Sequence, residues 1–509
     1  MNRLVALGAL FILLMLTRLS SPVDLFDGDQ AKQVGYVMDI VRNGNWIVQY
    51  ETDGTIATKP PLYNWLAAIA SMIIHSTAPW VMKLPSLFAG VGLLTLVYLF
   101  ARKFFDESTA FWATAAFMAS HHFIKLIWFA RTDMLMVFGV YLAFWLVIDL
   151  RYSLYKSPLI GLLLGLNYLV KGPAGPSFFA ILLIIWAFHE GYLFKPGYWK
   201  QLLPGLVVFL VIAGSYLALL WNNQEFQNVV LNREIKSRLP GLAEEFEPIY
   251  LYAGWLLGRI APWPFVACAG LILSRRRPEW RSALSVASWA LGIFVFLSIL
   301  PSKRHDFLLP VYPPIFMLAG LGIKYVTDSP LEGIRKWAVW TAVALLVFLP
   351  AVMPFIMKHK WTVWVWMSAG GSFGCGVMAA LRIRKQPARA LLWICAGLII
   401  VNGLYNHGMG NSHPIGFYEK LRDFTARVRQ HTDHEPLIVW NTHPLIPYEL
   451  GLHEHFLELE DLKRKQPKWL ITETKLTGEI QQATGWRLSE EEALLLREKK
   501  VDVHLYRVD

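Results

Sequence analysis

The stretch DLFDGDQAKQVGYVMDIVRNGNWIVQYETDGTIATKPPLYNW, residues 24–65, is the longest polar passage in the first half of the chain and lies between two apolar segments. It contains several aspartates, among them Asp29, a Gly-x-Trp turn at residues 44–46, and Lys59 before two prolines. An ordinary solvated connection would explain any one of these residues alone. Carboxylates and a lysine gathered in one loop indicate instead a site around which the rest of the chain is organised.

Composition places the chain among polytopic membrane proteins. Of its 509 residues, 55% are hydrophobic and 17% are charged, and the mean hydropathy is +0.40. A soluble globule with a polar surface does not have this balance. Apolar segments long enough to cross a bilayer as helices recur along the chain. We predict an α-helical polytopic membrane protein with about thirteen transmembrane helices, near residues 4–20, 81–100, 109–124, 134–150, 158–170, 174–190, 202–221, 251–273, 282–300, 307–325, 337–356, 362–381 and 388–405.

Basic residues are concentrated in alternate loops, for example at 275–277 and 382–385. The positive-inside rule predicts that these loops are cytoplasmic and that the opening loop lies outside the cytoplasm. The net charge of +11 is then mostly topological. The basic residues flank membrane segments and do not alternate with aromatics on one solvent face, so nucleic acid is not a predicted partner. The three cysteines lie in apolar segments without CxxC spacing, and neither disulfides nor cysteine metal ligands are predicted.

Hydropathy falls after about residue 410. We therefore predict a transmembrane domain at 1–409, with a first extracytoplasmic loop at 21–80, and a soluble periplasmic α/β domain at 410–509. In the latter we expect helices near 416–431, 454–465 and 489–499, and strands near 437–441, 469–474 and 501–508. Within the opening loop, residues 30–43 and 57–75 have the pattern of helices that lie along a membrane surface.

Further charged residues stand in outward turns, where charge is costly unless it is paired or used. Arg131 and Asp133 flank a predicted helix start, and either form an internal pair that caps this helix or serve a site. Lys171 ends a helix before Gly172-Pro173, where a snorkelling lysine is the alternative. The loop at 222–250 is either a lid over a site or a plain solvated helix. Lys303, Arg304 and a histidine together on the outer side indicate an anionic ligand, because topogenic charge belongs on the other side.

The ordered set of motifs resembles the bacterial polyprenyl-phosphate-sugar glycosyltransferases related to aminoarabinose transferase and the protein O-mannosyltransferases, which belong to the GT-C superfamily (family 39). The residues that carry the resemblance are Asp29-Gln30, Gly44-Asn45-Trp46, Lys59-Pro60-Pro61-Leu62-Tyr63-Asn64-Trp65, Arg131-Thr132-Asp133, Lys171-Gly172-Pro173, Ala261-Pro262-Trp263 and Ser302-Lys303-Arg304. They cover the whole membrane region in the family's order.

The resemblance implies an inner-membrane glycosyltransferase that moves a sugar from an undecaprenyl or dolichyl phosphate donor to a lipid A, glycan or protein acceptor on the extracytoplasmic side. It implies catalytic roles for Asp29 and Asp133 and a donor-phosphate role for Lys59. Aminoarabinose transferases tend to carry Glu and Arg where this chain has Thr58 and Lys32. The sugar and the acceptor are therefore not fixed by the resemblance. No cofactor or metal ligand is assigned, and a divalent metal ion is left open.

The chemistry of such a reaction agrees with these residue types. A leaving lipid phosphate gains negative charge, which fixed cations stabilise, and the predicted donor-phosphate residues are Lys59, Arg131, Lys171, Lys303 and Arg304. A hydroxyl acceptor needs a base, for which Asp29 is the candidate, while Asp133 positions or neutralises cations. Tyr63, Trp65 and Trp263 offer surfaces for sugar or prenyl packing, with anchoring among the membrane lipids as the alternative.

Two other functional classes fit part of this pattern. A transporter or flippase of lipid-linked sugars would also be polytopic and basic on one side, but would place its ionisable residues near mid-membrane between related repeats. A scaffold built around the C-terminal segment is the second alternative. The charges here gather at outer helix ends and no repeat is visible, which favours an enzyme.

Overall fold

The computed structural model describes residues 2–19, 25, 28–50, 56–148, 156–224, 226–228, 230, 247–328, 363–383, 385–410, 417–433, 435–443, 445–452, 459–465, 467–496 and 501–509. The chain divides into two compact units. The first, Met1–Ser21 with Ser86–Gly408, is called the helical unit here, and the second, Pro22–Pro85 with Met409–Asp509, the sheet unit. Most of the 222–250 loop and the predicted membrane helix at 337–356 lie outside the described residues.

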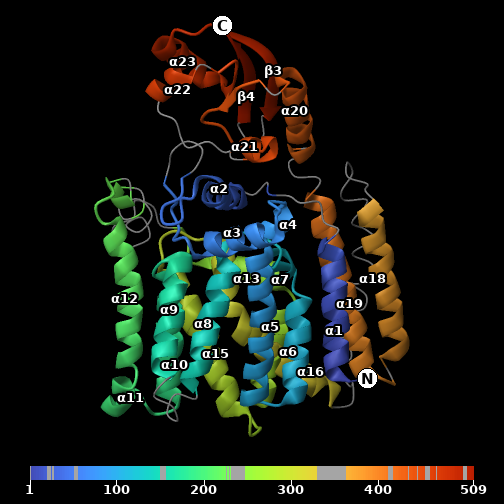
Figure 1. Cartoon of the computed structure of the whole chain (residues 1–509). Coiled ribbons are helices and arrows are strands. Elements are labelled where there is room, and N and C mark those ends of the chain that lie inside the picture. The colour runs from blue at the N-terminus through green and yellow to red at the C-terminus, as the bar shows by residue number, and fades with distance from the viewer. Residues whose placement is uncertain are drawn as a thin grey trace. The chain divides into compact units, whose positions relative to one another are not determined.

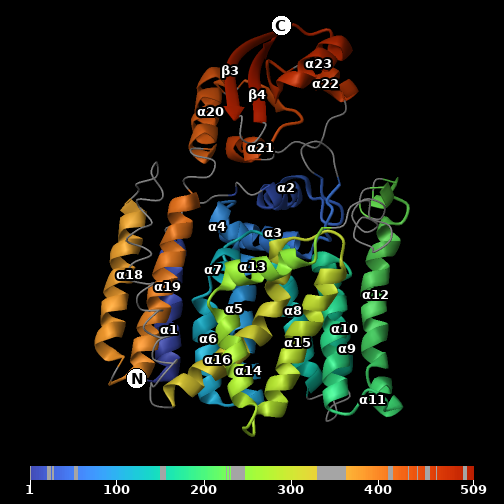
Figure 2. The ribbon, with the colours of Figure 1, turned by 180° about the vertical axis from the view of Figure 1, so that it is seen from behind.

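The helical unit is a bundle of α-helices, most of which run side by side (Figures 1 and 2). Apolar segments adopt this form because a helix satisfies every backbone polar group within its own segment. Its elements are α1 (Arg3–Leu19), α5 (Leu84–Phe104), α6 (Glu107–Met118), α7 (His121–Leu126), α8 (Thr132–Ile148), α9 (Lys156–Lys171), α10 (Ala174–His189), α11 (Pro196–Lys200), α12 (Leu203–Leu220), α13 (Tyr250–Ile260), α14 (Trp263–Ser274), α15 (Trp280–Ile299), η4 (His305–Val311), α16 (Tyr312–Thr327), α18 (Val363–Arg382) and α19 (Pro387–Gly410).

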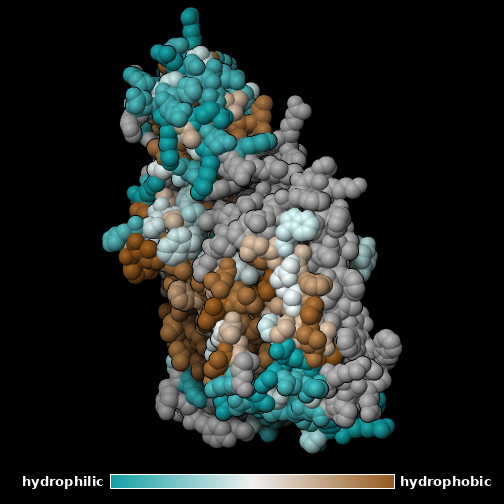
Figure 3. Space-filling model, turned by 90° about the vertical axis from the view of Figure 1, so that its right-hand side faces the viewer, coloured by the Kyte–Doolittle hydropathy of each residue, from teal (hydrophilic) through white to brown (hydrophobic). Residues whose placement is uncertain are grey.

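Five helices in the described part of the chain are long and apolar enough to cross a membrane. They are Leu84–Phe104, Leu203–Leu220, Trp280–Ile299, His305–Thr327 and Pro387–Leu404. Figure 3 shows apolar side chains along the outside of this bundle and a hydrophilic rim at one end of it. The protein is therefore a mostly helical polytopic membrane protein, as predicted, while the total of thirteen membrane helices stays a prediction.

Two predicted membrane helices are broken. The segment predicted at 251–273 consists of α13 and α14, which meet at an angle of 98°. Pro262 directly precedes the first residue of α14 and Pro264 lies in its first turn, so prolines mark the break. The prediction of one continuous helix at 109–124 is wrong, because α6 ends at Met118 and α7 begins at His121. Ser120 between them has an extended backbone, with φ −76° and ψ 128°.

Close backbone contacts fix α16 between α6 and α14. A Cβ atom added at Gly320 of α16 would lie 2.5 Å from the backbone nitrogen of Ala113 in α6. A Cβ added at Gly270 of α14 would lie 2.2 Å from the carbonyl oxygen of Leu318. Glycine at both positions therefore lets three helices approach more closely than side chains would allow, as is common in membrane helix packing.

The substitution Gly320→Ala tests this packing, with Gly370→Ala in α18 as the matched control. A Cβ at Gly370 meets nothing within 4 Å. We expect Gly320→Ala to lower the free energy of unfolding by about 1–3 kcal/mol through overpacking, whereas Gly370→Ala gains about 0.5–1 kcal/mol of helix propensity. Thermal unfolding of the detergent-purified protein measures both, and equal midpoints would contradict the proposed close contact.

The sheet unit combines helices of the opening loop with a four-stranded sheet. The loop contributes α2 (Gly28–Asn43), α3 (Leu62–Ile74) and α4 (Pro79–Met82). The sheet has the order β1-β2-β4-β3, with β1 parallel to β2 and the other pairs antiparallel. Its elements are α20 (Phe417–Thr432), β1 (Leu437–Val439), α21 (Leu445–Leu450), α22 (Leu459–Lys465), β2 (Trp469–Glu473), η5 (Thr474–Leu476), α23 (Thr477–Thr484), β3 (Leu488–Leu496) and β4 (Val501–Val508).

The prediction of a helix at 489–499 is wrong, because β3 occupies Leu488–Leu496. The sequence SEEEALLL has strong helix propensity, which a strand partner overrides here. β3 pairs along its length with β4, with one irregularity between Glu490 and Glu492. Leu494 is buried and Leu495 is exposed, as expected for a strand with one covered face. The helices predicted near 416–431 and 454–465 and the three predicted strands correspond to observed elements.

Within the sheet unit, polar side chains join the loop helices to one another and to the C-terminal segment. The Asp39 carboxylate accepts hydrogen bonds from the Asn43 and Asn45 amides at 2.7 and 3.0 Å and thereby holds the turn at residues 44–46. The Tyr448 hydroxyl in α21 donates to the Thr77 carbonyl at 2.6 Å. The Tyr448 bond and a second one, from Arg42 to the Gly451 carbonyl, join the opening loop to residues 409–509.

Candidate active site

A network of buried charges lies in the helical unit. Arg131 precedes α8, Asp133 stands in its first turn, and Asp306 is the second residue of η4. The Arg131 guanidinium donates to Asp306 Oδ2 at 2.5 Å and lies 3.3 Å from Asp133 Oδ2. Both carboxylate side chains are only 4% exposed. Buried charges persist in this way only when they are paired and hydrogen-bonded.

Lys171, the last residue of α9, completes the network. Its ammonium group donates to Asp133 Oδ1, and its Nζ lies 4.7 Å from the centre of the Phe307 ring. Both oxygens of Asp133 therefore contact cations. The lysine, Asp133, Arg131 and Asp306 form a series of alternating charges with a formal sum of zero, which reduces the cost of burying them at a helix end.

Asp306 also contacts two histidines. His122 Nε2 lies 2.9 Å from Asp306 Oδ1, and His305 Nδ1 lies 2.6 Å from the same oxygen. His122 is fully buried, and its Nδ1 lies 2.5 Å from the Tyr312 hydroxyl at the start of α16. The Asp306 carboxylate thus connects α7, η4 and the segment before α8.

Lys303 and Arg304 directly precede η4. The Lys303 ammonium donates to the Leu300 carbonyl at 2.8 Å, and its backbone N–H donates to the Glu247 carboxylate. Burial lowers the pKa of the Lys303 amine below its ordinary value, and the negative charge of Glu247 opposes this shift. The Arg304 residue is exposed, and its backbone N–H lies 3.4 Å from the Tyr252 hydroxyl.

The remaining predicted residue of the helical unit is Trp263, the first residue of α14. It is buried, and its ring centre lies 5.9 Å from that of Phe316 in α16. The structure therefore gives Trp263 a packing contact inside the bundle. A substrate-packing role for it stays a prediction.

The other predicted residues belong to the sheet unit. Asp29 lies in the first turn of α2, where a carboxylate is favourable beside free backbone N–H groups. The Lys59 ammonium lies 3.4 Å from the Thr58 hydroxyl. Tyr63 is fully buried and donates its hydroxyl to the Met82 carbonyl at 2.9 Å, and the Trp65 indole donates to the Trp46 carbonyl. Nothing in these contacts tests the roles predicted for the four residues.

The structure brings Arg131, Asp133 and Lys171 into one cluster, although 38 positions separate the lysine from the aspartate in the sequence. The Arg131–Asp133 pair exists, but it is part of this larger network. Lys171 does not snorkel, because its side chain is 7% exposed and contacts Asp133. Sequence reasoning missed His122 and Asp306 as site residues. The available signal was a pair of histidines in an otherwise apolar segment, followed far along the chain by a third histidine beside an acid.

Comparisons with known proteins extend this description. Residues 58–217 match the family model described as dolichyl-phosphate-mannose-protein mannosyltransferase. An undecaprenyl phosphate-alpha-4-amino-4-deoxy-L-arabinose arabinosyl transferase from Shewanella sediminis is 24% identical over 411 residues, which cover 76% of this chain and 72% of that protein. A second protein of this description, from Proteus mirabilis, is 23% identical over 72% of this chain and 69% of its own length.

The fold has a solved counterpart. The crystal structure of ArnT from Cupriavidus metallidurans bound to undecaprenyl phosphate aligns with a TM-score of 0.75 at 16% identity and covers 99% of this chain and 97% of that one. The family match, the two relatives and this fold together support a polyprenyl-phosphate sugar transferase of the GT-C superfamily. The protein is a glycosyltransferase. The family resemblance inferred from its motifs is confirmed.

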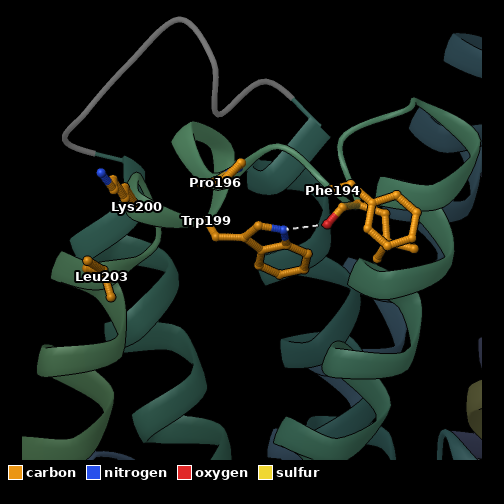
Figure 4. Close-up of a pocket in the computed structure, with 6 residues that line it drawn as sticks. Phe194, Pro196, Trp199, Lys200 and Leu203 are labelled. Atoms are coloured by element: carbon orange, nitrogen blue, oxygen red, sulfur yellow. Dashed lines mark hydrogen bonds between the residues drawn. The ribbon is translucent and has the colours of Figure 1, made fainter.

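A hollow elsewhere in this glycosyltransferase is not part of the charged network. It has a volume of about 430 Å³ and is lined by Leu193, Phe194, Pro196, Trp199, Lys200 and Leu203, between α10 and α12 (Figure 4). The Trp199 indole donates to the Leu193 carbonyl at 2.9 Å, and Phe194 is 89% exposed. The lining is mostly apolar and contains no acid or base pair that could act in sugar transfer.

The substitution Lys171→Met tests whether the transferase depends on the buried pair with Asp133. It keeps a side chain of similar length but leaves the buried carboxylate with one cation fewer. We expect the free energy of unfolding to fall by about 3–5 kcal/mol. Lys195→Met is the control, because Lys195 is exposed and its Nζ lies 5.0 Å from the Tyr192 ring centre, a contact worth about 0.5–1 kcal/mol. Similar shifts of the two thermal midpoints would contradict a structural role for the network.

Proposed function

We propose that this protein transfers a sugar from a polyprenyl phosphate, undecaprenyl or dolichyl, to a lipid A, glycan or protein acceptor on the extracytoplasmic side of the inner membrane. The observation that carries the proposal is the buried series of alternating charges from Lys171 to Asp306, with the basic residues Lys303 and Arg304 directly before η4. The donor named for the relatives, undecaprenyl phosphate-linked aminoarabinose, and the lipid bound to the similar ArnT structure support a polyprenyl phosphate carrier.

In the proposed reaction, an acceptor oxygen attacks the anomeric carbon of the sugar, and the bond from that carbon to the phosphate oxygen breaks. The electron pair of this bond leaves with the polyprenyl phosphate, which gains negative charge. Cations held in a partly dry environment stabilise that charge before it is protonated. The released polyprenyl phosphate keeps this negative charge. Positively charged side chains, lysine and arginine, are therefore the candidates for binding it.

We propose that the donor phosphate is bound by Lys59, Arg131, Lys171, Lys303 and Arg304. These residues differ in the groups that they already contact. Arg131 and Lys171 each contact carboxylates, so part of their charge is already compensated. The Lys303 ammonium donates to the Leu300 carbonyl. We infer that the Arg131–Asp306 ion pair fixes the start of η4 directly after Lys303 and Arg304 and so positions this basic pair for the phosphate.

The two candidate acids receive different roles. Asp133 has a cation on each oxygen, which suits a residue that positions charges and not one that accepts a proton. Asp29 is then the candidate base for a hydroxyl acceptor, which loses its proton as the new bond forms. A phosphate acceptor is already ionised and would need no base.

The organisation of the chain completes the proposal. We propose that residues 410–509 form an extracytoplasmic α/β domain. The membrane region is proposed to contain about thirteen helices. Tyr63, Trp65 and Trp263 are proposed to pack against the sugar, the prenyl chain or membrane lipids. The four-stranded sheet in the C-terminal segment supports the first part.

A transferase assay with radiolabelled polyprenyl-phosphate sugar in proteoliposomes tests the function. We expect sugar transfer together with release of the lipid phosphate, whereas a flippase would move intact donor and a scaffold would do neither. Lys59→Ala should lower the rate on the order of a hundredfold if Lys59 stabilises the leaving phosphate. Lys32→Ala, an exposed lysine of α2, serves as the control and should keep nearly full activity. Full activity and unchanged donor affinity in Lys59→Ala would remove Lys59 from the site.

The substitution Asp29→Asn separates a base from a helix-end residue. Asparagine and aspartate have similar effects at helix starts, so stability should change by only a few tenths of a kcal/mol. If Asp29 is the base, turnover on a hydroxyl acceptor should fall by about two orders of magnitude while donor binding is retained. Near-normal turnover would refute the assignment. An equally severe loss with a phosphate acceptor would indicate a positioning role.

A further inference from the structure

Three side chains of the helical unit present potential metal ligands to one point. They are His122 of α7 and His305 and Asp306 at the start of η4, and their ligand atoms lie within 4.8 Å of one another. Asp306 Oδ1 lies 2.9 Å from His122 Nε2 and 2.6 Å from His305 Nδ1. Two imidazoles and one carboxylate are a donor set that suits zinc.

In His122 and Asp306, the nitrogen or oxygen on the side away from this point already contacts another residue. His122 Nδ1 lies 2.5 Å from the Tyr312 hydroxyl, and Asp306 Oδ2 accepts from Arg131 at 2.5 Å. Metal-binding imidazoles and carboxylates are typically held in this way by partners on their far side, which fix the direction of the inner atom. The inner atoms of His122 and Asp306 are therefore directed at the same point as His305 Nδ1.

The spacing is close to what a tetrahedral ion requires. Zinc bonds of about 2.0–2.1 Å separate neighbouring ligand atoms by about 3.3 Å. The distances from Asp306 Oδ1 to His122 and His305 would therefore lengthen by roughly 0.4 and 0.7 Å, with the larger change at His305. His122 is fixed by burial, but the His305 side chain is 31% exposed and has room to adjust. Its partial exposure also provides a route for an ion to enter.

We propose that His122, His305 and Asp306 form a binding site for a zinc-type divalent cation, with a fourth position for water. Such an ion would connect α7 to η4, whose residues are far apart in the sequence. This inference does not depend on the proposed transferase activity. Asp133 is not among the ligands, since both of its oxygens contact cations.

Zinc content tests the proposal directly. The full-length protein, purified in detergent through a histidine-free tag, is stripped with chelator, re-equilibrated with Zn²⁺ and analysed by inductively coupled plasma mass spectrometry. We expect one ion per chain in the wild type, and a zinc affinity at least tenfold lower in His305→Ala. The control is His189→Ala, because His189 lies in α10 with its Nε2 3.1 Å from the Ser288 hydroxyl. X-ray absorption at the zinc edge should show two imidazole nitrogens.

Three results would overturn the site. They are a wild type that retains no zinc, a His305→Ala variant that binds as well as the wild type, and an equal loss in His189→Ala. The first result would leave Asp306 as the centre of a hydrogen-bonded pair of histidines without a metal. Because the His305 side chain is partly exposed, its variant should remain folded, and size-exclusion chromatography checks this. None of these outcomes bears on sugar transfer, which the labelled-donor assay measures separately.

Discussion

The ion pair between Arg131 and Asp306 is the contact on which the charged region of the helical unit depends. Removing a carboxylate from water costs several kcal/mol, and only close partners offset this cost. Asp306 meets the requirement with the guanidinium and two imidazoles. A further hydrogen bond, from Tyr141 of α8 to the Pro310 carbonyl at 2.7 Å, holds the same turn from another side. The short η4 helix is thereby fixed to α7 and α8 by polar groups.

Neutrality explains how so many ionisable groups occupy one buried place. Four formal charges alternate from Lys171 to Asp306, so no part of the series carries a large excess. Lys303 and Arg304 directly precede η4, which contains Asp306. The neutral network therefore fixes the turn that carries this basic pair.

Much of this arrangement was predictable, because charge is costly in apolar segments. That rule alone singled out Arg131, Asp133 and Lys171, and hydropathy gave the membrane class. It could not give Asp306 a role, since the sequence does not show that the histidine pair at 121–122 and the acid at 306, far apart in the chain, come together. The α6–α7 break was hidden because no proline or glycine marks it, and Ser120 and two histidines are its only polar residues within an apolar segment. The strand at 488–496 was hidden for another reason: its glutamates and leucines favour a helix until β4 supplies a partner.

The sheet unit is assembled from two pieces of chain, 22–85 and 409–509, with the residues from 86 to 408 between them. Chains emerge from the ribosome in order, and a unit folds when all of its parts have been made. The opening loop therefore leaves the ribosome long before Tyr448, which donates to the Thr77 carbonyl, and Gly451, whose carbonyl accepts from Arg42. Completion of the sheet unit is consequently one of the last events in biogenesis, after the membrane helices between its halves have been inserted.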